Sequence, residues 1–145
     1  MPSIPDQLLR RLRDPGLAGQ ILRFTIVGGV GFVLDAGILK TLVYFQLHPA
    51  IARVGSLAAA VTFTWWANRT LTFEPGRAPS WSEFRAYVLT SLVGLAINYG
   101  GYSLAVVFGA PLVAAVAIGT LAGSVFNFIR YRVLLTGDPK AGRRG

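Results

Sequence analysis

Two polar side chains lie within long apolar stretches of this sequence. Asp35 is about halfway along the apolar run that begins at Phe24, and Asn98 lies in a run, residues 86–129, without a charged side chain. An ionised carboxylate at the centre of a membrane-spanning helix costs about 2.5–3.5 kcal/mol, so a charge at that depth is a candidate for function. We hypothesise that Asp35 and Asn98 face each other along a polar path. The alternative is an interhelical hydrogen bond or an ion pair, for example with Lys40, that only holds the helices together.

Four arginines at the ends of the apolar runs are candidates for binding phosphate. Arg69 and Arg132 lie at the ends of the second and fourth runs, and Arg23 and Arg85 lie at the starts of the first and third. A planar guanidinium group pairs well with phosphate oxygens, and lipid phosphates lie at the depth where helices leave the membrane. The alternative is that each arginine only fixes the topology of the chain.

Residue counts exclude several kinds of chemistry. The sequence has no cysteine and only one histidine, His48, which leaves too few groups for a thiolate or histidine metal site or for a catalytic triad. The glycines at 28–31 lack the strand and turn of a nucleotide-binding loop. We therefore expect no enzyme activity, no metal and no cofactor.

The composition and the apolar runs predict an all-α integral membrane protein. The chain has 145 residues, of which 53% are hydrophobic and 14% charged, whereas soluble domains carry about 25% charged residues. About 20 apolar residues cross a bilayer core as a helix. Four such spans are expected, at residues 24–47, 50–73, 86–108 and 112–135, separated by breaks at His48-Pro49, at Gly109-Ala110-Pro111 and in the polar loop 74–83.

The placement of the basic residues predicts how the chain lies in the membrane. The net charge is +8, and Arg53 alone lies on the side opposite the basic ends, with Lys40 inside the first span. Positive residues favour the cytoplasmic side, so both termini and the middle loop are expected there. Basic residues gathered at the cytoplasmic ends of the helices explain the net positive charge better than nucleic-acid binding does. Tryptophans 65, 66 and 81 and Tyr131 are expected in an aromatic belt at the same interface.

The sequence divides into three parts on this basis. Residues 1–20 form a cytoplasmic N-terminal segment, in which three leucines between positions 5 and 15 predict a short interfacial helix or, alternatively, a disordered basic tail. Residues 21–136 form the four-helix domain, and residues 137–145 form a basic cytoplasmic tail.

The two halves of the membrane domain resemble each other at an offset of 63 residues. The offset aligns Gly31 with Gly94, Asp35 with Asn98 and Arg69 with Arg132, giving repeats at about 22–73 and 85–136. Each repeat holds two spans, so the copies share one orientation and form tandem parallel hairpins. Small residues recur every fourth position at 52, 56, 60 and 64, and at 115, 119, 123 and 127. Such stripes let membrane helices approach closely.

These motifs together resemble the GtrA-like family of small bacterial membrane proteins. The resemblance covers residues 22–135 and rests on Arg23-Phe24, Gly28-Gly29, Asp35 and the segment Asn68-Arg69-Thr70-Leu71-Thr72-Phe73, then on Arg85, Tyr87, Gly94, Asn98, Asn127-Phe128 and Arg132. The chain departs from the family pattern at Thr64 and Tyr131, where the family has asparagine.

The resemblance implies that the protein moves polyprenyl-phosphate-linked monosaccharides across the bacterial inner membrane for cell-surface polysaccharide or glycolipid modification. Substrate contacts would then come from Arg23, Asp35, Asn68, Arg69, Arg85, Asn98, Asn127 and Arg132. Four short helices enclose little volume, so a homo-oligomer among membrane lipids is expected. The alternatives are a membrane scaffold that recruits a glycosyltransferase and a small ion or cation/drug transporter that uses Asp35.

Overall fold

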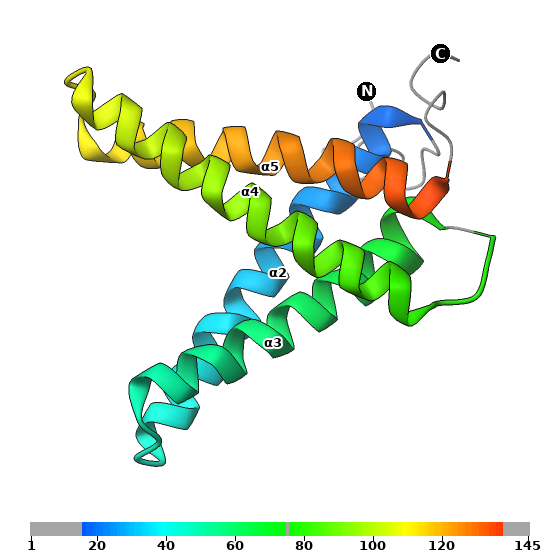
Figure 1. The fold of residues 1–145 in the computed structure, drawn as a ribbon, viewed down its shortest axis with the longest axis horizontal. Coiled ribbons are helices and arrows are strands. Elements are labelled where there is room, and N and C mark those ends of the chain that lie inside the picture. Colours follow the sequence, from blue (N-terminus) through cyan, green and yellow to red (C-terminus); the bar gives the residue numbers. More distant parts are fainter. Residues whose placement is uncertain (1–15, 75, 138–145) are drawn as a thin grey trace, which may run out of the picture. The chain divides into compact units, whose positions relative to one another are not determined.

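The computed structural model describes residues 16–74 and 76–137, and within these ranges the chain is helical with no strand. The elements are α2 (Leu17–Tyr44), α3 (Pro49–Ala67), η1 (Asn68–Phe73), α4 (Trp81–Val107) and α5 (Leu112–Thr136). They form two units, Met1–Glu74 and Pro75–Gly145. In hairpin 1, α2 packs against α3 and η1; in hairpin 2, α4 packs against α5 (Figure 1). The prediction of an all-α protein is confirmed, and the expected interfacial helix lies outside the described residues.

The ends of the helices in hairpin 1 follow from local residue chemistry. Proline at the first position of a helix has no N–H to leave unsatisfied, and α3 begins at Pro49 with the His48 Nδ1 accepting from the Ala50 N–H at 3.3 Å. The helix α2 begins at Leu17, before the expected start at residue 24. Hydropathy marked only its apolar part, whereas residues 17–23 contain no proline to end the helix.

Hairpin 2 begins and ends on capping residues. The Ser80 hydroxyl accepts from the Glu83 N–H at 3.1 Å, which satisfies one of the free amide groups in the first turn of α4. Gly109 has φ of 82°, a left-handed conformation that glycine adopts without strain, and it separates α4 from α5. Gly137, with φ of 68°, closes α5 in the same conformation.

Three helices, α2, α4 and α5, are long and apolar enough to cross a membrane, with 28, 27 and 25 residues. The fourth helix, α3, has 19 residues and carries Arg53 near its start; η1 continues it to Phe73. Only 11% of the most apolar window of α2 is buried inside the protein. Its apolar surface therefore faces outward, an arrangement that suits lipid rather than water.

Candidate functional site

Small residues bring the helices of hairpin 1 together. Ala52, Ser56 and Ala60 of α3 are buried, as their spacing predicts. At Gly31 of α2, an added Cβ would lie 2.5 Å from the Thr64 Cγ2, so any larger residue there would force Thr64 to move. Close approach of this kind lets membrane helices pack through dispersion contacts.

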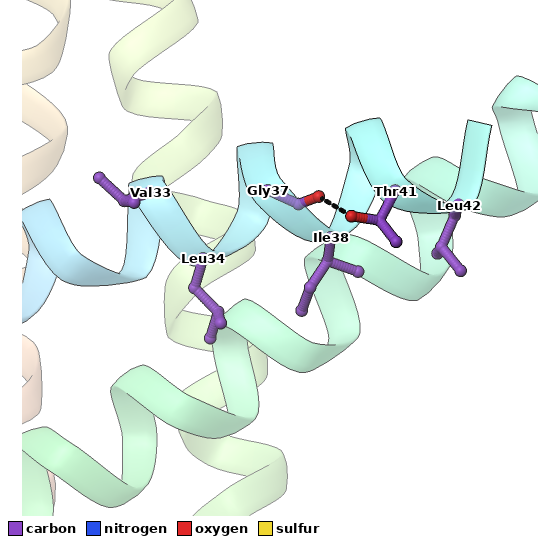
Figure 2. Close-up of a pocket in the computed structure, with 6 residues that line it drawn as sticks. All are labelled: Val33, Leu34, Gly37, Ile38, Thr41 and Leu42. Carbon is purple, nitrogen blue, oxygen red and sulfur yellow. Dashed lines mark hydrogen bonds between the residues drawn. The ribbon is translucent and has the colours of Figure 1, made fainter. Parts of the chain in front are cut away.

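A shallow apolar groove of about 370 Å³ lies along α2, where Leu34 and Ile38 point toward α3 (Figure 2). Its lining comes entirely from α2: Val33, Leu34, Gly37, Ile38, Thr41 and Leu42. The only hydroxyl in this lining, on Thr41, donates to the Gly37 carbonyl at 2.8 Å. The groove offers an apolar surface but no free polar group that would select a ligand.

The backbones of α4 and α5 approach even more closely in hairpin 2. An added Cβ at Gly94 would collide with the Asn127 amide, and one at Gly123 would lie 2.9 Å from the Asn98 Cβ. Asn98 therefore packs against α5 within its own hairpin, where it also lines a groove with Tyr99 and Tyr102. The Asn127 Oδ1 is buried and has no hydrogen-bond partner among the described residues.

Asp35 forms an ion pair with Arg53, not with Lys40. The Asp35 Oδ2 lies 2.8 Å from the Arg53 Nη1, and the side chains are 15% and 48% exposed respectively. Lys40 is exposed and lies five residues after Asp35, about 140° around the helix, which turns it away from the carboxylate. The structure therefore contains an interhelical ion pair, which was the alternative interpretation of Asp35, but its cation is Arg53 and not Lys40. Whether Asp35 faces Asn98 stays a prediction, since the two residues belong to different hairpins.

Three predicted site residues, Arg23, Asn68 and Arg69, lie in the first part of α2 and in η1, a region that we call the arginine end of hairpin 1. Asn68 and Arg69 are 2% and 7% exposed. The Asn68 Oδ1 accepts from the Thr72 hydroxyl at 3.0 Å, and the Arg23 Nη2 donates to the Thr72 carbonyl at 3.5 Å. The segment is a six-residue π-helical turn, a wide helical form that occurs frequently at functional sites. No residue pattern in the sequence signals this geometry.

The corresponding end of hairpin 2 is held by two stacked tyrosines. The rings of Tyr87 and Tyr131 lie 3.9 Å apart, and the Tyr131 hydroxyl shares a hydrogen bond with the Ser91 hydroxyl. The expected placement of Tyr131 in an aromatic belt is wrong, because this side chain is 4% exposed and packs inside the hairpin. Arg132 is partly buried one residue later, whereas Arg85 is exposed on α4.

Arg77 links the two helices of hairpin 2 at the same end. Its guanidinium group donates to the Glu83 carboxylate at 3.1 and 3.2 Å and to the Leu134 carbonyl at 2.7 Å. The Glu83 side chain is only 2% exposed. From the sequence, Arg77 is only one of the basic residues of the middle loop that favour the cytoplasmic side. Glu83, six positions later, was a signal that the two residues could pair.

Arg77→Gln is therefore expected to destabilise hairpin 2. The change removes the arginine that is paired with a buried carboxylate, a loss that costs about 3 kcal/mol. Glu83→Gln should cost less, because glutamine still accepts from the arginine. Thermal unfolding in detergent, followed by circular dichroism, measures both. Equal stability of Arg77→Gln and the wild type would contradict the role of this pair.

Long apolar helices with a few polar groups between them define a helical integral membrane protein. The sequence matches the GtrA/DPMS transmembrane domain family over residues 23–136, so the chain belongs to this family. The resemblance noted in the sequence is confirmed, and membership fits a membrane protein related to polyprenyl-phosphate sugars. A comparison with curated proteins finds no match to the chain.

Proposed function

We propose that the protein flips a polyprenyl-phosphate-linked monosaccharide across the bacterial inner membrane. The observation that carries the proposal is the arginine end of hairpin 1, where Arg69 is 7% exposed beside the buried Asn68. A guanidinium group at the end of an apolar helix attracts a lipid phosphate more strongly than it would in water, because the local dielectric is lower. The family, with its relation to polyprenyl-phosphate sugars, supports this choice of ligand.

In the proposed mechanism, the phosphate binds first at the cytoplasmic side. Arg69 and Arg132 are proposed to bind the phosphate, and Arg23, Asn68, Arg85 and Asn127 are proposed as further substrate contacts. Asp35 and Asn98 are the polar groups proposed to contact the sugar as it crosses, while the polyprenyl tail stays in lipid. No bond is made or broken. The direction of movement follows the concentration gradient that sugar use outside maintains. The excess of basic residues at the arginine end supports its cytoplasmic placement.

Two equivalent contacts support a tandem arrangement of the hairpins as parallel repeats. Gly31 receives Thr64 in hairpin 1, and Gly94 receives Asn127 in hairpin 2. Both residues of the second pair lie 63 positions after those of the first. Polar groups then recur at related positions of both hairpins, and a homo-oligomer would bring several copies of them together.

Neutralising both phosphate-binding arginines should stop flipping without unfolding the protein. Each lost charge-assisted hydrogen bond is worth about 1.5–3 kcal/mol, so Arg69→Gln/Arg132→Gln is expected to lower the flipping rate at least about tenfold. The assay uses proteoliposomes that contain a labelled polyprenyl-phosphate monosaccharide and reads its exposure on each side. Arg130→Gln is the matched control, since Arg130 is exposed on the same helix.

The results separate the proposed function from its alternatives. Flipping by the wild type and by Arg130→Gln, but not by the double variant, supports a flippase. A protein that never flips the lipid yet co-purifies with a glycosyltransferase would instead be a scaffold. Proton-coupled cation flux without lipid movement would show a small transporter.

A further inference from the structure

Hairpin 1 carries a second arginine at the end opposite η1, beside the turn between α2 and α3. Arg53 lies four residues after the first residue of α3, which is about 6 Å along the helix. Asp35 lies nine residues before the last residue of α2, which places its carboxylate farther from the turn than the start of α3 is. The Arg53 backbone therefore lies close to the turn, and its side chain extends along the hairpin to reach Asp35.

The Asp35–Arg53 pair leaves most of the guanidinium group unused. Its Nη1 donates one hydrogen bond, to the Asp35 Oδ2 at 2.8 Å, although a guanidinium group carries five N–H donors. The Arg53 side chain is 48% exposed. The Asp35 Oδ1 is buried without a hydrogen-bond partner among residues 16–74 and 76–137. An arginine with a carboxylate commonly forms two parallel bonds, so this one-point contact leaves a donor edge open.

The charges around the turn favour an anion at that edge. Lys40 lies near the same end of the hairpin, and in its described residues the only acidic side chains are Asp35 and Glu74. Glu74 directly follows η1 at the arginine end, so it does not reach the turn. Between residues 16 and 74, hairpin 1 thus supplies no second carboxylate near the turn to balance Arg53.

We infer that Arg53 is a phosphate-binding residue at the turn end of hairpin 1, where it receives the phosphate of a lipid after passage through the membrane. The inference rests on the proposed function for its ligand, since the cargo carries a phosphate at headgroup depth. Asp35 occupies one N–H of the guanidinium group, and phosphate oxygens occupy the others. The same chemistry suits two sources of phosphate, the lipid-linked sugar and an ordinary anionic phospholipid.

Nuclear magnetic resonance of the arginine side chains tests this binding without any need for transport. The purified chain is labelled with ¹⁵N-arginine in phosphatidylcholine nanodiscs, and the Arg53 Nε–H signal is assigned by its disappearance in Arg53→Lys. Titrated citronellyl phosphate, a short polyprenyl phosphate, is expected to shift this signal.

A separate sample in phosphatidylglycerol nanodiscs identifies the source of the phosphate. A shift already present there assigns the site to an anionic phospholipid, and a shift that needs citronellyl phosphate assigns it to the cargo. No shift in either arm would overturn the inference.

Two variants distinguish a specific site from a general positive charge. Arg53→Lys keeps the charge and the ion pair with Asp35 but loses the planar donor edge, so binding of citronellyl phosphate is expected to weaken about tenfold. Because this variant has no Arg53 signal, binding to the wild type and to both variants is compared through the ³¹P signal of citronellyl phosphate. Lys40→Gln removes a neighbouring charge and should weaken binding less than Arg53→Lys does. A larger loss in Lys40→Gln would overturn the assignment to Arg53.

The flipping assay and the Arg53 signal together distinguish failure of this inference from failure of the proposed function. If the wild type flips the lipid and the Arg53 signal does not respond, the inference is wrong and the flippase stands. If the signal responds and no lipid is flipped, Arg53 binds phosphate in a protein with another role.

Discussion

Gly119→Ala is expected to force α4 and α5 apart. Among single glycine-to-alanine substitutions in hairpin 2, it should lower the free energy of unfolding the most. An added Cβ at this position would collide with the backbone carbonyl of Asn98 and lie 3.0 Å from the Tyr102 Cβ. A backbone carbonyl cannot rotate away as a side chain can. Overpacking costs about 1–3 kcal/mol and occasionally more, and the rigid obstacle here places the loss at the upper end of this range.

Gly100→Ala is the matched control for this measurement. Gly100 lies on α4 too, but no atom lies within 4 Å of its added Cβ. Alanine is favoured over glycine in a helix by about 1 kcal/mol, so this variant should be as stable as the wild type or more stable. Unfolding by dodecyl sulfate titration compares the two, and spin labels on α4 and α5 report their separation. Equal effects of both substitutions would show that the helices are not closely packed at Gly119.

The spacing of small residues predicted the contacts within each hairpin. Residues four apart share a helix face, so the series that contains Ala52, Ser56 and Ala60 indicated correctly which side of α3 is buried. The breaks at Pro49 and Gly109 followed from backbone chemistry alone. Periodicity and turn residues act within a short segment, and a single sequence contains that information.

The partner of Asp35 required information that a single sequence does not contain. Arg53 lies 18 residues away on another helix, so the pairing depends on the register between α2 and α3, which packing at Gly31 and Thr64 fixes. Lys40 was the nearer cation in the sequence and points elsewhere. The π-helical turn at Arg69 depends on tertiary packing in the same way, because its residues are compatible with an ordinary helix.

Arg53→Leu is expected to destabilise hairpin 1. The substitution leaves the Asp35 carboxylate without its cation in an apolar segment. Loss of one partner costs about 3 kcal/mol in a fully buried ion pair, and the loss should be smaller here because the Arg53 side chain is 48% exposed. Thermal unfolding in detergent measures it, with Lys40→Leu as a control because Lys40 is exposed on the same hairpin.

Replacement of both partners separates the structural role of the pair from its role in transport. Asp35→Leu/Arg53→Leu removes both charges and should return stability to within about 1 kcal/mol of the wild type, because apolar replacement of a whole ion pair is often neutral or stabilising. Flipping of a polyprenyl-phosphate monosaccharide in proteoliposomes should nevertheless fall at least about tenfold, since the sugar loses hydrogen bonds worth about 1.5–3 kcal/mol each. A stable double variant that flips at the wild-type rate would reduce Asp35 to a packing residue and move the polar path elsewhere in the protein.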